Sequence, residues 1–365
     1  MSFAAAKTNL LKYIKDYLGV LLKDSGRYRS AIQGPRDPTG NPPWIHLRNR
    51  NERLIANPDG LGVRCDFPHS SKLHALQFLR GFAPKLLHRA LTDWPIQFCD
   101  APQQSGDPVV SFLFAHRGTD RLKQLVHVIR SVFGQHGVPI EVIVADLTRP
   151  HLGSQLPDGI THLPIDDSQL TPGWRKAWAF NIAARQARGE VLVFQDGDIC
   201  VPRDYAVELK RQLITGEWQA ASLQRFLFYL SSSATQEALA ASSWPNYGVD
   251  AVSQNWKGGT IAIRRDAFFA IGGFDEGFVD WGGEDDEFFD RCGTLRHNRF
   301  GYLPFVHLWH PPQAVRKDCA NPNIDLILPR RLQMPVDARV QELRARNAGQ
   351  VAAPIPVTAY KEQNA

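Results

Sequence analysis

Cysteine is sparse in this sequence, and the few cysteines form no pattern. An odd number without a Cys-x-x-Cys pair favours reduced thiols, and with them a cytosolic setting, over a disulfide framework or a zinc site. The five positions are Cys65, Cys99, Cys200, Cys292 and Cys319.

Long apolar runs are missing as well. No run approaches the ~20 apolar residues that span a bilayer. The N-terminus also lacks the charged-then-apolar pattern, ending in small residues, of a secretory signal. We therefore expect a cytoplasmic protein without a membrane span.

The sequence also lacks a strong net charge of either sign. The formal net charge is +5 and the pI is near 9.0, and the charge is spread evenly along the chain. This excess fits a nucleotide phosphate or an anionic membrane surface, but it is too small to indicate a nucleic-acid partner. The 365 residues suffice for one large domain with appendages or for two domains.

A strand–helix–strand pattern begins near residue 109. Residues 109–115 and 140–146 are apolar runs typical of buried strands, and 121–133 form an amphipathic helix between them. Ligands of open α/β sheets bind at the carboxyl ends of strands. Arg117 and Asp146 follow such ends and are candidate nucleotide contacts. The alternative for each is that it merely caps a loop.

A third buried strand, 190–195, follows a helix predicted over 174–188, and it delivers Asp196 and Asp198 at its carboxyl end. Two carboxylates separated by one small residue can share a divalent cation that neutralises a diphosphate. Hard oxygen ligands suit Mg²⁺ or Mn²⁺. Pairs of this kind are also frequent in turns. Residues 231–250, small and polar, are expected to form a loop.

Residues 272–287 combine glycines, aromatics and carboxylates. Three adjacent acids, Glu284, Asp285 and Asp286, follow Trp281 and a Gly-Gly pair. Such neighbours repel one another unless they are solvated, paired with cations or used as acids and bases. An aromatic face beside carboxylates suits a sugar. The alternative is a solvated helix N-terminus, which the helix dipole favours.

Two histidines stand three residues apart after a predicted strand. His307 and His310 can bind one metal ion if the chain bends, whereas a regular strand would turn them to opposite sides. The alternative is a structural role for each.

The first helix is expected over residues 4–23. Its leucines recur at helical spacing, and lysines occupy other faces. It is predicted to dock on the main domain or, alternatively, to lie on a membrane surface.

Together these motifs resemble a GT-A glycosyltransferase over roughly residues 108–315. The block from Trp281 to Asp286 is similar to the carboxyl-terminal signature of β-1,4-galactosyltransferases and related bacterial family 2 enzymes. The resemblance implies an α/β, Rossmann-like fold with a mixed, mainly parallel sheet flanked by helices. We expect an N-terminal helical extension (1–105), the transferase domain (106–325) and a C-terminal helix with a poorly ordered tail (326–365).

The resemblance also implies roles for individual residues. Mn²⁺ or Mg²⁺ would be held by Asp198 and His310, with His307 where the animal enzymes have a methionine. Asp285 would be the general base. The remaining expected contacts fall into two groups: the nucleotide side comprises Arg117, Asp146, Lys176, Asn181, Asp196, Gly258 and Gly259, and the acceptor and donor-sugar pocket comprises Trp281, Glu284 and Asp286.

The implied reaction is an inverting transfer of a hexose or N-acetylhexosamine, of galactose type, from a UDP-sugar to a hydroxyl of a glycan or glycolipid. The setting would be bacterial surface polysaccharide synthesis at the inner face of the membrane. Two alternatives remain: a retaining UDP-sugar transferase, and a non-catalytic sugar-binding or membrane-surface scaffold with the same fold.

Overall fold

The computed structural model describes residues 3–241, 244, 247–311 and 321–350. The chain divides into two compact units whose segments alternate along the sequence. Unit 1 comprises Met1–Pro95, Leu223–Trp256 and Arg299–Trp309, and unit 2 comprises Ile96–Ser222, Lys257–Asn298 and His310–Ala365. The expected extension, 1–105, thus differs from unit 1 in two ways: residues 96–105 belong to unit 2, and two later segments of the chain belong to unit 1.

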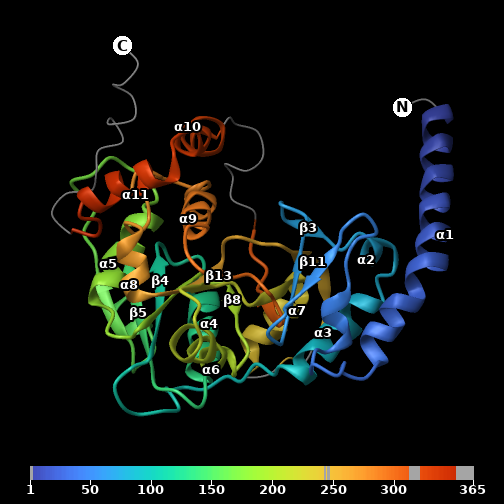
Figure 1. Cartoon of the computed structure of the whole chain (residues 1–365), viewed down its shortest axis with the longest axis horizontal. Helices are drawn as coiled ribbons and strands as arrows, with labels where there is room; N and C mark the ends of the chain where they lie inside the picture. Colours follow the sequence, from blue (N-terminus) through green and yellow to red (C-terminus); the bar gives the residue numbers. More distant parts are fainter. Residues whose placement is uncertain (1–2, 242–243, 245–246, 312–320, 351–365) are drawn as a thin grey trace. The chain divides into compact units, whose positions relative to one another are not determined.

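Unit 2 is built on a seven-stranded sheet of order β13-β9-β12-β7-β4-β5-β6 (Figure 1). The neighbours β4–β5, β4–β7, β5–β6 and β9–β13 pair in parallel, and β12 runs antiparallel to β7 and β9. This confirms the predicted mixed, mainly parallel sheet. The strands are β4 (Val110–His116), β5 (Ile140–Asp146), β6 (Thr161–Pro164), β7 (Val191–Gln195), β9 (Ala220–Ala221), β12 (Thr260–Arg264) and β13 (His297–Asn298).

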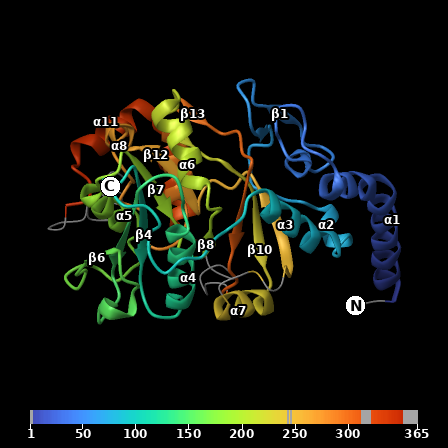
Figure 2. The ribbon, with the colours of Figure 1, turned by 90° about the horizontal axis from the view of Figure 1, so that it is seen from below.

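Helices cover both faces of this sheet (Figure 2). They are α4 (Leu122–Phe133), α5 (Lys176–Gln186), α6 (Tyr205–Lys210), α8 (Arg265–Ala270), α9 (Glu284–Cys292), α10 (Leu328–Gln333) and α11 (Val336–Ala345); short elements are β8 (Ile199–Cys200), η2 (Gly153–Gln155), η3 (Arg211–Thr215) and η5 (Asn323–Ile327). Leu113 of β4 shares one core cluster with α5, α8 and α9. Its neighbour Phe112 contacts Tyr205 of α6 instead. Burial on both faces explains why the central strands are continuously apolar.

Unit 1 has a smaller sheet in which β10 pairs antiparallel with β11 and parallel with β14. Buried Arg225 of β10 donates hydrogen bonds to the carbonyls of Ile45 and Leu47, and so ties the N-terminal segment to this sheet. The elements are α1 (Phe3–Gln33), η1 (Pro43–His46), β1 (Leu54–Ala56), β2 (Val63–Cys65), β3 (Ser71–Lys72), α2 (Ala75–Phe78), α3 (Phe82–Asp93), β10 (Gln224–Leu230), α7 (Ser232–Ala240), β11 (Val249–Gln254) and β14 (Leu303–His307).

The prediction of a loop over residues 231–250 is wrong for much of that segment. Ser232–Ala240 form α7, and β11 begins at Val249. The hydroxyl of Ser231 accepts a hydrogen bond from the backbone N–H of Ala234 at 3.2 Å, which is the N-cap that starts the helix. Alanine-rich sequence after such a cap favours a helix, and the small, polar composition concealed this signal.

The N-terminal helix is longer than expected, since α1 ends at Gln33. Among the residues that the structure describes, no helix combines the length and apolarity needed to cross a bilayer.

The C-terminal helices are an integral part of unit 2. Arg339 of α11 donates a hydrogen bond to buried Glu287 of α9 at 2.9 Å, and Arg291 binds the same carboxylate. On the preceding loop, the carboxylate of Asp275 pairs with Arg331 and Arg346. These guanidinium groups therefore fix α9 and the loop that precedes it. The expected tail after Gln350 lies outside the described residues.

We predict that Arg339→Gln destabilises unit 2 by on the order of 3 kcal/mol, because it removes one partner from an ion pair whose carboxylate is 0% exposed. Arg344→Gln on the same helix changes an exposed side chain and should shift stability by no more than about 0.5 kcal/mol. The midpoints of denaturant unfolding test this. Equal midpoints for the two variants would contradict it.

Candidate active site

Three chain segments meet around the ammonium group of Lys176, the first residue of α5. Its Nζ lies 3.0 Å from Asp196 Oδ1, 3.3 Å from Glu284 Oε1 and 3.3 Å from Asp285 Oδ2. Asp196 follows β7, and the other two acids begin α9. We call these four residues the Lys176 cluster. It brings the Asp-x-Asp motif and the acidic motif together within unit 2.

In the Lys176 cluster, burial and neighbouring charges bring the pKa of one carboxyl group, that of Asp285, close to neutral pH. Burial and the neighbouring Glu284 and Asp196 raise the pKa of Asp285 to about 7, although Lys176 opposes the shift. Burial likewise raises the pKa of Asp196, against the attraction of Lys176. Burial alone would lower the pKa of Lys176, yet three carboxylates raise it well above its ordinary value. The cluster therefore holds a permanent cation beside a carboxyl group that can exchange protons near neutral pH.

Two glycines determine where α9 begins. Gly282 and Gly283 have φ values of +108° and +87°, which a residue with a Cβ rarely adopts. A Cβ at Gly283 would also lie 2.7 Å from the ring of Phe278. The chain can therefore turn sharply and place its acids in the first helical turn, where the dipole favours negative charge.

The second Gly-Gly pair packs against the cluster itself. A Cβ at Gly258 would lie 2.1 Å from Asp285 Oδ2. The carbonyl of Gly259 accepts a hydrogen bond from the N–H of Asp196 at 2.7 Å. This backbone thus lies against the carboxylate of Asp285 and the main chain of Asp196, and glycine is needed at position 258 for the close approach to Asp285. Its predicted contact with a donor stays a prediction.

Asp198, the second acid of the Asp-x-Asp motif, meets a histidine. Its Oδ2 lies 3.2 Å from His310 Nε2 and 3.3 Å from Arg121 Nη1. A carboxylate oxygen and an imidazole nitrogen at this separation form a donor pair of the kind that Mn²⁺ accepts. His307 ends β14 of unit 1, where its ring centroid lies 4.7 Å from that of Tyr229. Its part in a metal site stays a prediction.

The predicted nucleotide contacts have partners inside the protein. Asp146 is 0% exposed and accepts hydrogen bonds from the N–H groups of Thr148 and Leu152 and from His162. In this structure it caps its own loop, the alternative that the sequence left open. Arg117 donates to the carbonyl of Gly173 at 2.5 Å.

Asn181 is buried and joins two segments of unit 2. Its amide donates to Phe274 O and Glu276 Oε1 and accepts from Phe274 N–H. These bonds tie α5 to the loop that precedes the acidic motif. The geometry therefore gives Asn181 a positioning contact, and a direct contact with a nucleotide stays a prediction.

The acidic motif also presents an open side. Trp281 is 37% exposed, and Asp286 pairs with Lys257 at 2.9 Å. The residues that provide an exposed aromatic face and a solvated ion pair are thus close in sequence to members of the Lys176 cluster. Lys257 and Arg121 were not predicted as site residues. Only their positions in the sequence could have indicated a role in the site: Lys257 precedes the Gly258-Gly259 pair, and Arg121 comes directly before the helix that follows the first strand.

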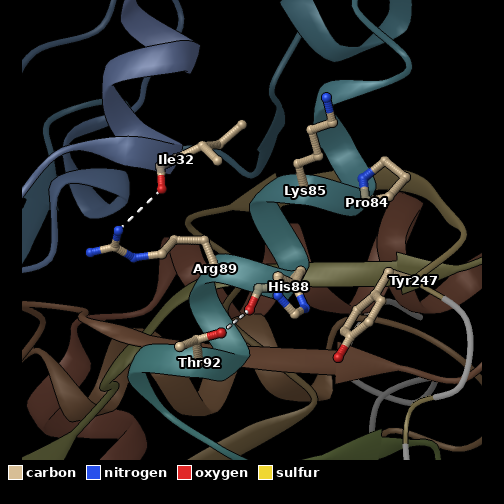
Figure 3. A pocket seen from close by; sticks show the side chains of 7 residues that line it. All are labelled: Ile32, Pro84, Lys85, His88, Arg89, Thr92 and Tyr247. Carbon is tan, nitrogen blue, oxygen red and sulfur yellow. Dashed lines mark hydrogen bonds between the residues drawn. The ribbon is translucent and has the colours of Figure 1, made fainter.

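Unit 1 contains a separate cavity of about 430 Å³ (Figure 3). Its walls include Lys85, His88 and Tyr247, and none of the predicted site residues lines it. Arg89 is turned away to donate a hydrogen bond to the carbonyl of Ile32 at 3.1 Å. The described residues that line this cavity include no carboxylate.

Comparison with protein families gives a match over part of the chain. Residues 241–302 match the family described as the N-terminal domain of galactosyltransferase. The matched segment contains Gly258-Gly259 and the whole acidic motif from Trp281 to Asp286. No curated protein sequence matches the chain.

Solved structures of glycosyltransferases show distant similarity. The catalytic domain of Drosophila beta1,4-galactosyltransferase 7 in complex with xylobiose is 17% identical, with a TM-score of 0.35, over 62% of this chain and 82% of that chain. Mannosyltransferase PcManGT from Pyrobaculum calidifontis, in complex with GDP-Man and Mn²⁺, is 18% identical, with a TM-score of 0.36, over 79% and 89%. Similarity at this level is too low to identify a substrate.

The family match agrees with the glycosyltransferase class predicted from the motifs over residues 241–302. The chain is similar to galactosyltransferases over the segment that includes the acidic motif.

We predict that sugar transfer rises with pH to a plateau, with a midpoint near pH 7, because the carboxyl group of Asp285 accepts a proton only after it has lost its own. Lys176 lowers the pKa of Asp285, so Lys176→Met should move the midpoint to higher pH. The measurement is the pH dependence of kcat/KM at saturating metal.

Lys257→Met is the control for this prediction, since Lys257 pairs with Asp286 rather than Asp285. It should leave the midpoint in place. A midpoint that moves equally in both lysine variants, or in neither, would contradict the assignment.

Proposed function

We propose that this protein is an inverting, metal-dependent glycosyltransferase that moves a hexose or N-acetylhexosamine, of galactose type, from a UDP-sugar to a hydroxyl group of a glycan or glycolipid. One observation carries the proposal: Lys176 binds both Asp196 of the Asp-x-Asp motif and Asp285 of the acidic motif. We infer that the proposed proton acceptor lies beside the motif that also carries Asp198, the proposed metal ligand.

The donor set at Asp198 and His310 supports a divalent cation. One carboxylate oxygen and one imidazole nitrogen, 3.2 Å apart, suit Mn²⁺. When bound, such a cation neutralises the negative charge that develops on a diphosphate leaving group. Arg121, which also contacts Asp198, adds a fixed positive charge next to this position. The assignment of His307 as a further ligand rests on the sequence.

Asp285 is the proposed general base. An inverting transfer requires a carboxylate that removes the proton of the attacking hydroxyl on the side opposite the leaving group. A pKa raised to about 7 makes Asp285 a stronger proton acceptor than an ordinary carboxylate. Lys176 holds its Oδ2 at 3.3 Å and fixes its direction. Lys176 is therefore proposed as a positioning residue, besides the nucleotide contact expected for it.

The residues next to Asp285 are proposed to bind the sugars. The exposed ring of Trp281 offers an apolar face on which the C–H side of a sugar ring can stack. Glu284 and Asp286 carry carboxylates that accept hydrogen bonds from hydroxyl groups. Arg117, Asp146, Asn181, Gly258 and Gly259 remain the proposed surroundings of the nucleotide.

The biological setting is proposed from the resemblance. The acceptor would belong to a bacterial surface polysaccharide, and the reaction would take place in the cytoplasm. A screen of UDP release over donor sugars with Mn²⁺, with and without glycan acceptors, tests donor and acceptor together. The anomeric configuration of the product separates inversion from retention.

We predict that Asp285→Asn lowers transfer by roughly 10²–10⁴-fold, the usual contribution of a general base, while affinity for UDP and metal stays unchanged. Asp286→Asn is the matched variant, because it alters the adjacent acid, whose partner is Lys257. It should raise the KM for the acceptor more than it lowers kcat. If Asp285→Asn transfers sugar at the rate of the unaltered protein, Asp285 is not the base.

We predict that Asp198→Ala abolishes the part of UDP affinity that depends on Mn²⁺, because it removes the carboxylate of the proposed metal pair. Isothermal calorimetry with UDP, with and without Mn²⁺, measures this difference. Asp166→Ala, at an exposed carboxylate that pairs with Arg149, is the control and should retain it. UDP affinity that does not depend on Mn²⁺ in the unaltered protein would refute the metal assignment.

A further inference from the structure

Helix α1 has an exposed apolar face. Ile14, Tyr17, Leu18, Leu21 and Leu22 are all exposed, with Leu22 at 81% and Leu18 at 48%. A helix turns by about 100° per residue, so Ile14, Leu18 and Leu21 point the same way, with Tyr17 and Leu22 on either side. We call these five side chains the outer face of α1. Several exposed leucines gathered on one face are typical of an interaction surface rather than of scattered surface residues.

Unit 1 holds α1 by a different face. Val20, Tyr28 and Ala31 are buried, and the ring of Tyr28 lies 6.3 Å from that of Phe82 in α3. Arg50 pairs with buried Asp24. The helix is therefore anchored without its outer face. Its N-terminal turns extend past α2 and α3 (Figures 1 and 2).

The charges on α1 are mainly positive. Its sequence has six basic residues and two acidic ones. Asp24, one of the acids, is neutralised by Arg27 and Arg50. The other, Asp16, lies about 200° around the helix from Ile14 and so opposite the outer face. Exposed Lys15 lies about 100° around the helix from Ile14, just beyond Leu22 at the margin of the outer face, whereas exposed Lys23 lies about 180° from Ile14, near Asp16. The net charge of α1 is thus positive, with one lysine at the margin of the apolar stripe.

We propose that the outer face of α1 binds the surface of an anionic lipid bilayer. The apolar side chains would enter the boundary between headgroups and acyl chains, Lys15 would lie at the level of the acidic headgroups, and the net positive charge of α1 would attract them. A second copy of the chain fits less well, because two copies of α1 would bring like charges together. The apolar stripe, from Tyr17 round to Leu22, is also broader than the two positions per seven residues of a coiled-coil seam.

The test is co-sedimentation of the full-length protein with vesicles. Vesicles of phosphatidylcholine and phosphatidylglycerol should bind the protein, and added salt should weaken the binding because it screens the lysines. Vesicles of phosphatidylcholine alone should bind less. Leu18→Gln/Leu22→Gln should lower the partition coefficient on the anionic vesicles by about tenfold or more, since two apolar side chains no longer enter the lipid. Glutamine keeps the helix propensity close to that of leucine.

The matched control is Leu326→Gln/Leu332→Gln. These leucines are similarly exposed, at 46% and 45%, but lie in unit 2, and their replacement should leave vesicle binding unchanged. UDP release with a water-soluble acceptor should stay the same in both double variants, so the outcome is independent of the proposed catalysis. Equal binding by the two double variants, or no binding by the unaltered protein, overturns the proposal. So does a dimer in light scattering that Leu18→Gln/Leu22→Gln dissolves, which would identify a second copy as the partner.

Discussion

The contact between the ammonium group of Lys176 and three carboxylates is the interaction on which the candidate site depends. It joins the start of α5, the end of β7 and the start of α9, three segments that lie far apart in the sequence. Without a cation between them, Asp196, Glu284 and Asp285 would repel one another in a poorly solvated place. The same contact keeps Asp285 next to the Asp-x-Asp motif, as the proposed reaction requires.

A second set of cationic side chains pairs with other acids of the same stretch. Glu287 and Asp275 face guanidinium groups of Arg339, Arg331 and Arg346, whereas Glu284 and Asp285 face Lys176. These acids of the short stretch thus fall into two groups, one paired with arginine and one paired with Lys176. Those paired with arginine are buried and fix α9, since arginine stays charged under all working conditions. Asp285, beside Lys176, has a pKa raised to about 7.

The central strands were predicted well from the sequence, because short, continuous apolar runs bounded by polar residues are typical of strands that are buried on both faces. The strand predicted over 140–146 agrees with β5. That over 109–115 is shifted by one residue from β4 at both ends, and that over 190–195 begins one residue before β7. The segment 231–250 failed, because its small polar residues conceal a capped helix. The roles of Gly258 and Asn181 could not be foreseen either, since both depend on contacts with residues more than 20 positions away.

The sequence by itself determined the types of chemistry on offer: a pair of carboxylates after a strand, three acids after an aromatic and two glycines, and a histidine pair. Residue type and local order suffice for this, because strand ends and helix starts are set by near neighbours. Only the tertiary structure decided which of these groups meet. Lys176 lies at the centre of the candidate site, and the carboxylate of Asp146 accepts hydrogen bonds from its own loop. Packing of the sheet and helices fixes these distances, which sequence separation does not determine.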